Sequence, residues 1–226
     1  NKPFISYLIV TMIMSVSFTM VTSMLGYYID SYLKIEGIMG TLIMIAMLVV
    51  LGLFLVPCGI ISNKIGKAKT YALGLTIASA ALIGVFFLPA DCGIWIYILA
   101  AIAGMGFSAQ WVCPHSMIPD VIEYDELMTG ERREGVYYGM QATATKVTAA
   151  LASLITNWVL GFAKYDAKLG LQNQPESAQL AIRILFALVP AIFLLICVPL
   201  LIKYPITKQS HAEVLKQLEE RRKQQK

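Results

Sequence analysis

The sequence predicts an all-α integral membrane protein with six transmembrane helices, and two observations support this prediction. First, 58% of the 226 residues are hydrophobic and only 14% are charged, with a mean hydropathy of +0.68. A soluble domain carries roughly a quarter charged residues, so most of this protein's surface is expected to face lipid. Second, the chain contains six apolar segments of the length, about 20 residues, that a helix needs to cross the hydrocarbon core.

The six predicted spans follow one another along almost the whole chain, and each is bounded by charged residues or by Gly, Pro and Asn. They cover residues 4–29, 38–62, 70–88, 94–117, 136–162 and 180–202. We therefore predict a six-helix transmembrane bundle over residues 1–203 and a basic tail over residues 204–226. The chain begins with Asn1 and lacks the charged region and cleavage site of a signal peptide, so we expect it to start within a longer protein.

Basic residues predict the orientation of the bundle. Six spans place both termini on one side, and that side carries most of the Lys and Arg residues, which favours the cytoplasm. The net charge of +4 reflects this asymmetry, and no nucleic-acid partner is expected. In the tail, Val214 and Leu218 are four residues apart, which predicts either a helix on the anionic membrane surface or a solvated tail. The predicted cytoplasmic basic residues are Lys2, Lys64, Lys67, Lys69, Arg132, Arg133, Lys203, Lys208, Lys216, Arg221, Arg222, Lys223 and Lys226, and those opposite are Lys34, Lys164, Lys168 and Arg183.

Small residues predict close packing between helices. Without a hydrophobic drive between helices in lipid, small side chains allow neighbouring backbones to approach. Ala100, Gly104 and Ser108 recur every four residues on the fourth span, and Gly135 and Gly139 do so at the start of the fifth. We expect both sets to lie at helix contacts.

Lys146 is the most informative residue, because it lies near the middle of the fifth span, far from Glu134 and Lys164, the nearest charges along the chain. A Lys at a helix centre costs about 2.5–3.5 kcal/mol on insertion scales, so it should face a wet cavity or a partner. The acidic residues lie in predicted loops, at span ends or in the tail. The partner is therefore a substrate, water or a part of the protein outside this chain, unless the lysine joins two helices through backbone carbonyls.

Other polar residues surround Lys146 on the predicted helix. At 100° per residue, Tyr138, Gln141, Thr145 and Thr148 share with Lys146 an arc of roughly 160°. A polar stripe at membrane depth predicts the lining of a pore or pocket, although Thr can also bond neighbouring helices. Near the end of the fourth span, Trp111 is either an interfacial anchor or a platform for a sugar ring, and His115 is expected to be a satisfied structural histidine.

Two stretches of the sequence resemble a known family. Residues 119–135, PDVIEYDELMTGERREG, resemble the loop between helices ten and eleven of the glycoside–pentoside–hexuronide:cation symporters, a group of the major facilitator superfamily. Residues 59–69 are similar to the superfamily's G-x-x-x-D-[RK]-x-G-[RK] loop, with Asn63 where Asp is usual. The resemblance runs through the whole chain. It implies the carboxyl-terminal bundle (helices 7–12) of a twelve-helix transporter, built from inverted three-helix repeats, with an N-terminal six-helix half as its partner.

The resemblance also implies roles for individual residues. Trp111 and Gln141 match sugar-site residues, and Lys146 matches a functionally important Lys; Thr145 joins them through the polar stripe, while Ala142 stands where a hydroxyl residue is found. The family's cation-binding carboxylates lie in the half that is absent here, so we expect the coupling Na⁺ or H⁺ to bind there and no metal or cofactor to bind this chain. The predicted loop contributes gating residues on the cytoplasmic side, namely Asp120, Tyr124, Asp125, Arg132 and Arg133.

The function predicted from these observations is import of a sugar or sugar acid (a glycoside, pentoside or hexuronide) by symport with Na⁺ or H⁺ across the plasma (inner) membrane. Two alternatives remain open. The solute could instead be another amphipathic molecule such as a lysolipid, or the protein could be a membrane scaffold without transport, which would not need a buried Lys on a polar face. An enzyme is not expected, because the spans contain no Asp pair, no Ser/His set and no HExxH motif.

Overall fold

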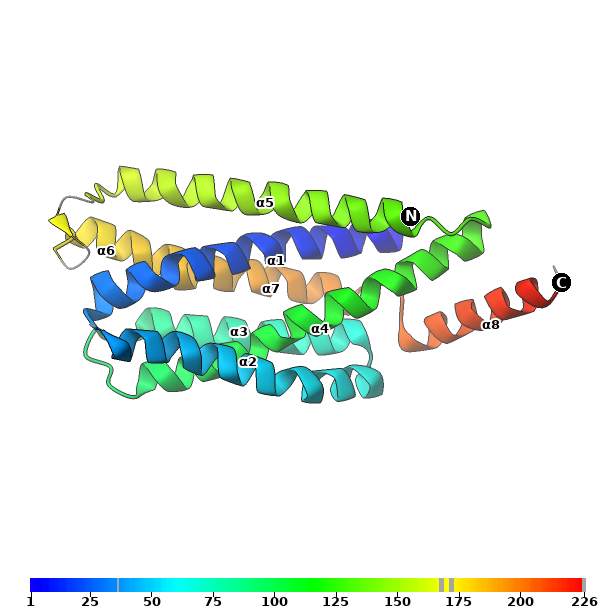
Figure 1. Ribbon diagram of the computed structural model, residues 1–226, viewed down its shortest axis with the longest axis horizontal. Helices are drawn as coiled ribbons and strands as arrows, with labels where there is room; N and C mark the ends of the chain where they lie inside the picture. The colour runs from blue at the N-terminus through cyan, green and yellow to red at the C-terminus, as the bar shows by residue number, and fades with distance from the viewer. Residues whose placement is uncertain (36, 167–168, 171–172, 225–226) are drawn as a thin grey trace.

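The computed structural model describes residues 1–35, 37–166, 169–170 and 173–224, without the side chains of Arg222 and Gln224. Within these residues the chain forms long antiparallel helices and no strand (Figure 1). A π-helical turn, Tyr28–Leu33, continues α1, and another, Ile184–Leu188, joins α6 to α7, so that α6 and α7 act as one helix. The helices are α1 (Lys2–Tyr27), α2 (Ile38–Ile65), α3 (Lys67–Phe87), α4 (Trp95–Thr129), α5 (Glu134–Phe162), α6 (Glu176–Arg183), α7 (Val189–Ile202) and α8 (Lys208–Gln224).

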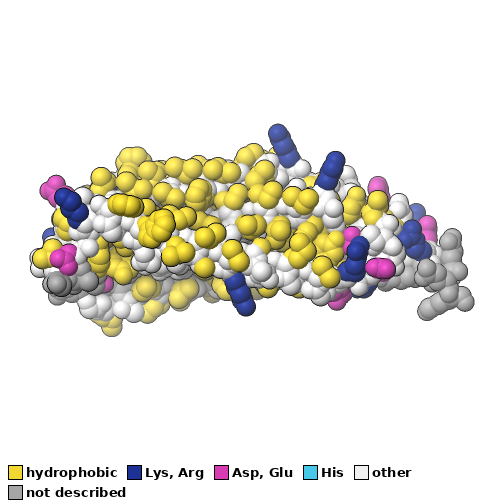
Figure 2. Space-filling model, turned by 90° about the horizontal axis from the view of Figure 1, so that it is seen from above, with side chains coloured by type: hydrophobic (Ala, Val, Ile, Leu, Met, Phe, Trp, Pro, Cys, Tyr) yellow, Lys and Arg dark blue, Asp and Glu magenta, His cyan; other side chains and the backbone are white. Residues whose placement is uncertain are grey.

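The turns alternate between the two ends of the bundle. The N-terminus, the α2–α3 turn, the α4–α5 turn and α8 lie at one end, which we call the α8 end, and the other turns lie opposite (Figure 1). Figure 2 shows hydrophobic side chains over the middle of one face and acidic side chains near its two ends. The described basic residues that were predicted to be cytoplasmic therefore all lie at the α8 end. Two of the basic residues in the prediction, Lys168 and Lys226, lie outside the described residues.

Five helical stretches are long and apolar enough to cross a membrane by length and composition: Lys2–Leu33, Ile38–Ile65, Lys67–Phe87, Trp95–Thr129 and Glu176–Ile202. The fifth predicted span, now α5, is not among them. It has 29 residues and runs beside α1, but Lys146, Asn157 and its Thr and Ser residues lower its hydropathy. Hydropathy thus supports five of the six predicted spans, and length and packing support α5.

The fourth helix is longer than predicted. The fourth span was expected to end near residue 117, with a loop over residues 119–135, but α4 continues through Pro114 and Pro119 to Thr129. Proline removes a backbone donor without ending the helix here. Side chains of other helices bond this stretch: the Tyr7 hydroxyl donates to the Pro114 carbonyl at 3.3 Å, and Lys67 donates to that of Ser116 at 2.7 Å. Gly130, with φ 79°, ends the helix in the left-handed conformation.

The small residues of α4 pack closely, as predicted. Ala100, Gly104 and Ser108 are buried. A Cβ atom on Gly104 would collide with the carbonyl oxygen of Met47 on α2, and one on Gly106 would lie 2.5 Å from the backbone nitrogen of Ala78 on α3. The backbones of α2 and α3 therefore approach α4 at positions that only glycine permits.

The prediction that small residues lie at helix contacts is wrong for the two glycines of α5. A Cβ atom added to Gly135 or Gly139 would meet no atom within 4 Å. The reason is the position of α5: it packs mainly on α1, and no described helix covers the side on which these glycines lie.

The tail forms α8, which packs on the part of α4 that extends beyond the bundle. Val214 and Leu218, the two apolar residues four apart, are 8% and 4% exposed, and Arg221 donates to the Leu127 carbonyl at 2.9 Å. The predicted helical spacing is confirmed. The apolar side of α8 packs on protein. Neither predicted alternative, a helix on the membrane surface or a solvated tail, included such a contact.

Candidate functional site

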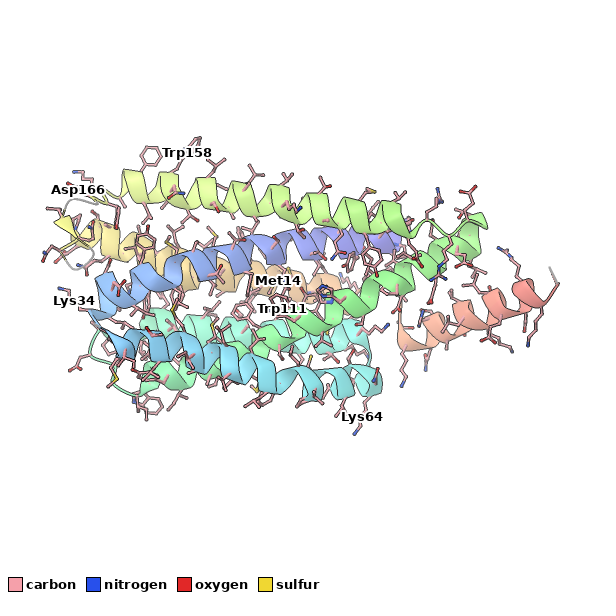
Figure 3. The ribbon with its side chains drawn as sticks, viewed as in Figure 1. Met14, Lys34, Lys64, Trp111, Trp158 and Asp166 are labelled. Atoms are coloured by element: carbon pink, nitrogen blue, oxygen red, sulfur yellow. The ribbon has the colours of Figure 1, made fainter. Side chains whose placement is uncertain are left out.

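Trp111 lies midway along α4, in the middle of the bundle (Figure 3). Its ring is 51% exposed and meets the ring of Phe18 on α1 edge to face, with centroids 6.4 Å apart and an interplanar angle of 83°. Phe18 in turn meets Phe107, which is fully buried, at 5.7 Å. Interfacial anchors lie near helix ends, so the position of Trp111 does not fit an anchor. It is a half-exposed aromatic ring at membrane depth with a rigid support.

One turn further along α4, His115 is also exposed. Its Nδ1 atom lies 3.0 Å from the carbonyl oxygen of Trp111. A carbonyl oxygen only accepts, so Nδ1 is the donor in this contact. The described residues give Nε2 no hydrogen bond. His115 was expected to be a satisfied structural residue, but only one of its two nitrogens is satisfied.

The first helix carries a polar stripe that the sequence analysis missed. One side of α1 carries four residues with a hydroxyl group, namely Tyr7, Thr11, Ser15 and Thr22. Their spacing of four and seven residues, which is typical of one face of a helix, could have revealed this stripe in the sequence. The Tyr7 hydroxyl reaches α4, as described above, and also interacts with the side chain of Gln141 on α5. The hydroxyl of Ser15 donates to the carbonyl of Thr145 at 3.1 Å. This stripe therefore connects the helices that carry Trp111 and Lys146.

The predicted polar arc of α5 is divided in the structure. Thr148 is buried and bonds the Ala144 carbonyl at 2.8 Å, so it belongs to the contact with the rest of the bundle. Gln141 and Thr145 are half-buried, and the Thr145 hydroxyl donates to the Gln141 carbonyl at 3.0 Å. Only Tyr138 and Lys146 of the arc are exposed.

The exposed surface of α5 has two sides of different composition. One side carries large apolar residues that suit lipid; the other carries small or polar residues. On a 100° wheel the first comprises Val136, Met140, Val147, Leu151, Leu154 and Trp158, and the second comprises Gly135, Tyr138, Gly139, Ala142 and Lys146.

The Lys146 ammonium has no hydrogen bond or ion pair with any described residue. The alternative that Lys146 joins two helices through backbone carbonyls therefore has no support in the structure. A charge at mid-span needs a polar or anionic partner. The exposed position leaves room for such a partner beside α5.

Trp111 and His115 on α4, and Gln141 and Lys146 on α5, are at least partly exposed. The first helix contacts both of these helices, because Ser15 bonds the Thr145 carbonyl and Phe18 meets Trp111. We call these four residues together the Trp111–Lys146 face. It offers an aromatic ring for stacking, an amide and an imidazole for hydroxyl groups, and an ammonium for an anion.

The predicted gating residues form a second constellation at the α8 end. The Lys67 ammonium donates to the carboxylate of Asp120 at 2.6 Å, and the Asp120 side chain is only 8% exposed. His211 of α8 contacts Glu123 at 2.6 Å and Asp120 at 3.3 Å. The beginning of α3, the extension of α4 and α8 are joined here.

The oxygens of Asp120 and Glu123 and a nitrogen of His211 lie within 4.8 Å of one another, a spacing at which a metal ion could be held. Lys67 already balances the Asp120 carboxylate, however, and its ammonium would repel a cation there. We therefore assign this cluster to ion pairing.

The α4–α5 turn holds further ion pairs. Arg133 pairs with the buried Asp125 at 3.0 Å, and Arg132 pairs with Glu134 at 2.6 Å and Glu126 at 3.1 Å. The hydrogen bond with Glu134 raises the pKa of Arg132 above its usual value.

The structure corrects the prediction that all five gating residues lie in a loop. Asp120, Tyr124 and Asp125 are on α4, and only Arg132 and Arg133 are in the turn. Helical hydrogen bonds continue to Thr129 because no residue before Gly130 ends them. Tyr124 is in no ion pair; with Asp120 and His211 it lines a pocket of about 200 Å³.

The sequence was compared with known proteins, and it matches a family of transporters. The family model described as MFS/sugar transport protein matches residues 1–208. An uncharacterized symporter, sll1374, of Synechocystis is 36% identical over 164 residues, which cover 71% of this chain and 30% of that protein. The glucuronide carrier protein homolog of Escherichia coli is 27% identical over 228 residues, covering 100% of this chain and 49% of that protein.

A vertebrate relative is named for a different substrate. The sodium-dependent lysophosphatidylcholine symporter 1 of Gallus gallus is 29% identical over 164 residues, which cover 72% of this chain and 30% of that protein. The chain spans about half the length, or less, of these curated relatives.

Proposed function

We propose that this chain, which belongs to the MFS/sugar transport protein family and is a multi-pass membrane protein, supplies the carboxyl-terminal six-helix half of a symporter that imports a sugar or sugar acid. In this proposal residues 1–203 form the bundle, a second six-helix half faces it, and the α8 end lies in the cytoplasm. The coupling Na⁺ or H⁺ binds in the other half. The observation that carries the proposal is the Lys146 ammonium, which is exposed and has no hydrogen bond or ion pair with any described residue; the half-exposed ring of Trp111 on α4 supports it.

Each residue of the Trp111–Lys146 face has a role in this proposal. Trp111 stacks on the apolar face of a sugar ring, Gln141 bonds ring hydroxyls, and Lys146 binds a carboxylate of the substrate or of the other half. The hydroxyl of the half-buried Thr145 already donates to the backbone carbonyl of Gln141, so in this proposal it can only accept a hydrogen bond from a substrate hydroxyl. Such sites lie near the midplane between two bundles. Trp111 lies midway along α4, in the middle of this bundle, which is consistent with such a site.

The ion pairs at the α8 end suit the proposed gate. Lys67–Asp120 and Arg133–Asp125 connect the ends of α3, α4 and the α4–α5 turn. When one bundle rocks against the other it moves largely as a rigid body, so the distances between helix ends within it change little. We propose that these pairs hold the bundle as a unit while the central site alternates between the two sides of the membrane.

A second candidate substrate is a lysophospholipid. Relatives named as sodium-dependent lysophosphatidylcholine symporters match 70–72% of this chain. The phosphate of such a lipid is an anion that Lys146 can bind, and its acyl chain suits the apolar sides of the helices. The glucuronide carrier homolog matches the full chain, and for this reason we place the sugar acid first.

Substrate competition tests the proposal. The full-length protein is reconstituted into liposomes under an inward Na⁺ or H⁺ gradient, and uptake of a radiolabelled hexuronate is measured against an excess of unlabelled hexuronate, neutral glycoside, pentoside or lysophosphatidylcholine. We expect competition by the sugar compounds, strongest by those that carry a carboxylate. Competition by the lysophospholipid alone would support the second candidate, and gradient-independent binding without uptake of any of these solutes would contradict symport.

A further inference from the structure

A pocket of about 310 Å³ lies at the α8 end, apart from the Trp111–Lys146 face. The beginning of α3, the end of α7 and the segment that leads into α8 form its walls. Lys67, Lys69 and Lys208 line it, and no acidic residue is among the described residues that do so. The pocket is therefore positively charged.

The beginning of α3 adds to this positive charge. Gly66 precedes α3 and provides no side-chain cap, and the first turn contains no acidic residue but two lysines. The free N–H groups and the helix dipole at this end favour an anion, and lysines there are unfavourable without one. Lys67 is balanced by Asp120. Lys69 has no partner among the described residues, and Lys208 donates only to a neutral acceptor, the Asn63 carbonyl, at 2.8 Å.

A second, independent observation points to a ligand. Tyr204 lines the same pocket and is only 6% exposed, and its buried hydroxyl has no hydrogen-bond partner among the described residues. Buried hydroxyl groups are nearly always bonded, and one without a partner is unfavourable. A ligand with acceptor oxygens would satisfy it.

We propose that this pocket binds the phosphate headgroup of an anionic phospholipid in the leaflet at the α8 end. Phosphate oxygens suit lysine ammonium groups, a tyrosine hydroxyl and the N–H groups at a helix beginning. Basic pockets of this kind between transmembrane helices bind anionic headgroups. The proposal adds a lipid site to the transport function and does not depend on which solute is carried.

The apolar part of the pocket favours a lipid over a soluble phosphate. Leu201 and Ile202 of α7 and Ile65 of α2 line it together with the lysines. Ile65 is 47% and Ile202 66% exposed, and both end helices that are apolar enough to span a membrane. An acyl chain attached to the phosphate can follow this surface into the hydrocarbon, which a free phosphate does not need.

The test measures the melting temperature of the purified full-length protein in a neutral detergent during titration with dioleoyl phosphatidylglycerol, dioleoyl phosphatidylcholine or inorganic phosphate. We expect phosphatidylglycerol to raise the melting temperature, and the other two to have little effect at the same concentration. In Lys69→Gln/Lys208→Gln, the affinity for phosphatidylglycerol should fall about tenfold or more. The control Lys216→Gln/Lys223→Gln removes two exposed lysines of α8 at the same end and should change the affinity less than about twofold.

Tyr204→Phe supplies a variant that keeps the charge and the packing. Without phosphatidylglycerol its melting temperature should equal or exceed that of the wild type, because the hydroxyl removed has no partner; its affinity for phosphatidylglycerol should fall severalfold. An equal response of the pocket and control variants would show that only general surface charge acts, and would overturn the proposal. An equal rise with inorganic phosphate, or no response to phosphatidylglycerol, would overturn it as well.

Discussion

Two neighbouring helices in the sequence, α4 and α5, use the same kinds of residue for opposite purposes. The glycines at the middle of α4 touch the backbones of α2 and α3, whereas Gly135 and Gly139 of α5 touch nothing. The acidic groups Asp120 and Asp125 of α4 are buried and paired, whereas Lys146 of α5 is exposed and unpaired. Satisfied groups hold the bundle together. In the proposed function, the unsatisfied groups mark the surface that binds a substrate or the other half of the transporter.

The largest expected effect comes from Lys146→Met, which keeps the length of the side chain and removes the charge. A charge-assisted hydrogen bond contributes about 1.5–3 kcal/mol, so uptake per folded molecule should fall about 10- to 100-fold. Expression and melting temperature should be unchanged or higher, because insertion of the charge no longer costs free energy. Lys203→Met, an exposed lysine at the end of α7, is the control. Normal uptake with a lowered melting temperature would show that Lys146 is structural.

In the ion-paired cluster at the α8 end, the substitution that corresponds to Lys146→Met is Lys67→Met. It leaves the buried Asp120 carboxylate with only its contact to His211, and we expect a loss of about 2 kcal/mol in the free energy of unfolding. The melting temperature in detergent measures it, with Lys64→Met, an exposed lysine without a described partner, as the control. If the two variants have the same melting temperature, the Lys67–Asp120 ion pair does not stabilise the bundle.

Gly104→Ala and Gly139→Ala compare the glycines directly. The new methyl group of Gly104→Ala would collide with the Met47 carbonyl, and overpacking of this kind costs about 1–3 kcal/mol. Gly139→Ala meets nothing and should stabilise the isolated chain by about 0.5–1 kcal/mol through helix propensity. Thermal melting of both variants measures the difference. Equal destabilisation would mean that a neighbour also covers Gly139 in the isolated chain.

Trp111→Ala should have a smaller effect on the transport site than Lys146→Met. Loss of aromatic stacking costs about 1 kcal/mol, which corresponds to about fivefold weaker substrate binding. The matched control is Trp158→Ala, an exposed Trp on the apolar side of α5. Substrate affinity by equilibrium binding should fall for Trp111→Ala only. If both changes leave affinity unaltered, Trp111 does not contact the substrate.

The sequence by itself determined the helical class, the approximate position of six long helices and the isolation of Lys146. These follow from local physics: in lipid, backbone groups must bond within their own segment, and a charge at mid-span is conspicuous in any apolar run. The packing ridge at Gly104 was predicted for the same reason, since it needs only the periodicity of one helix. The grouping of Trp111 with Gln141 and Lys146 came instead from the resemblance.

Only the tertiary structure decided how these helices use their side chains. The spacing that marks Gly104 also marks Gly135, and it cannot say which of the two meets a neighbour. The pairing of Asp120 with Lys67 and His211, the covering of Val214 by α4 and the open side of α5 depend on how whole helices are rotated against one another. That rotation arises from contacts between segments distant in the chain, and no local pattern of residues encodes it.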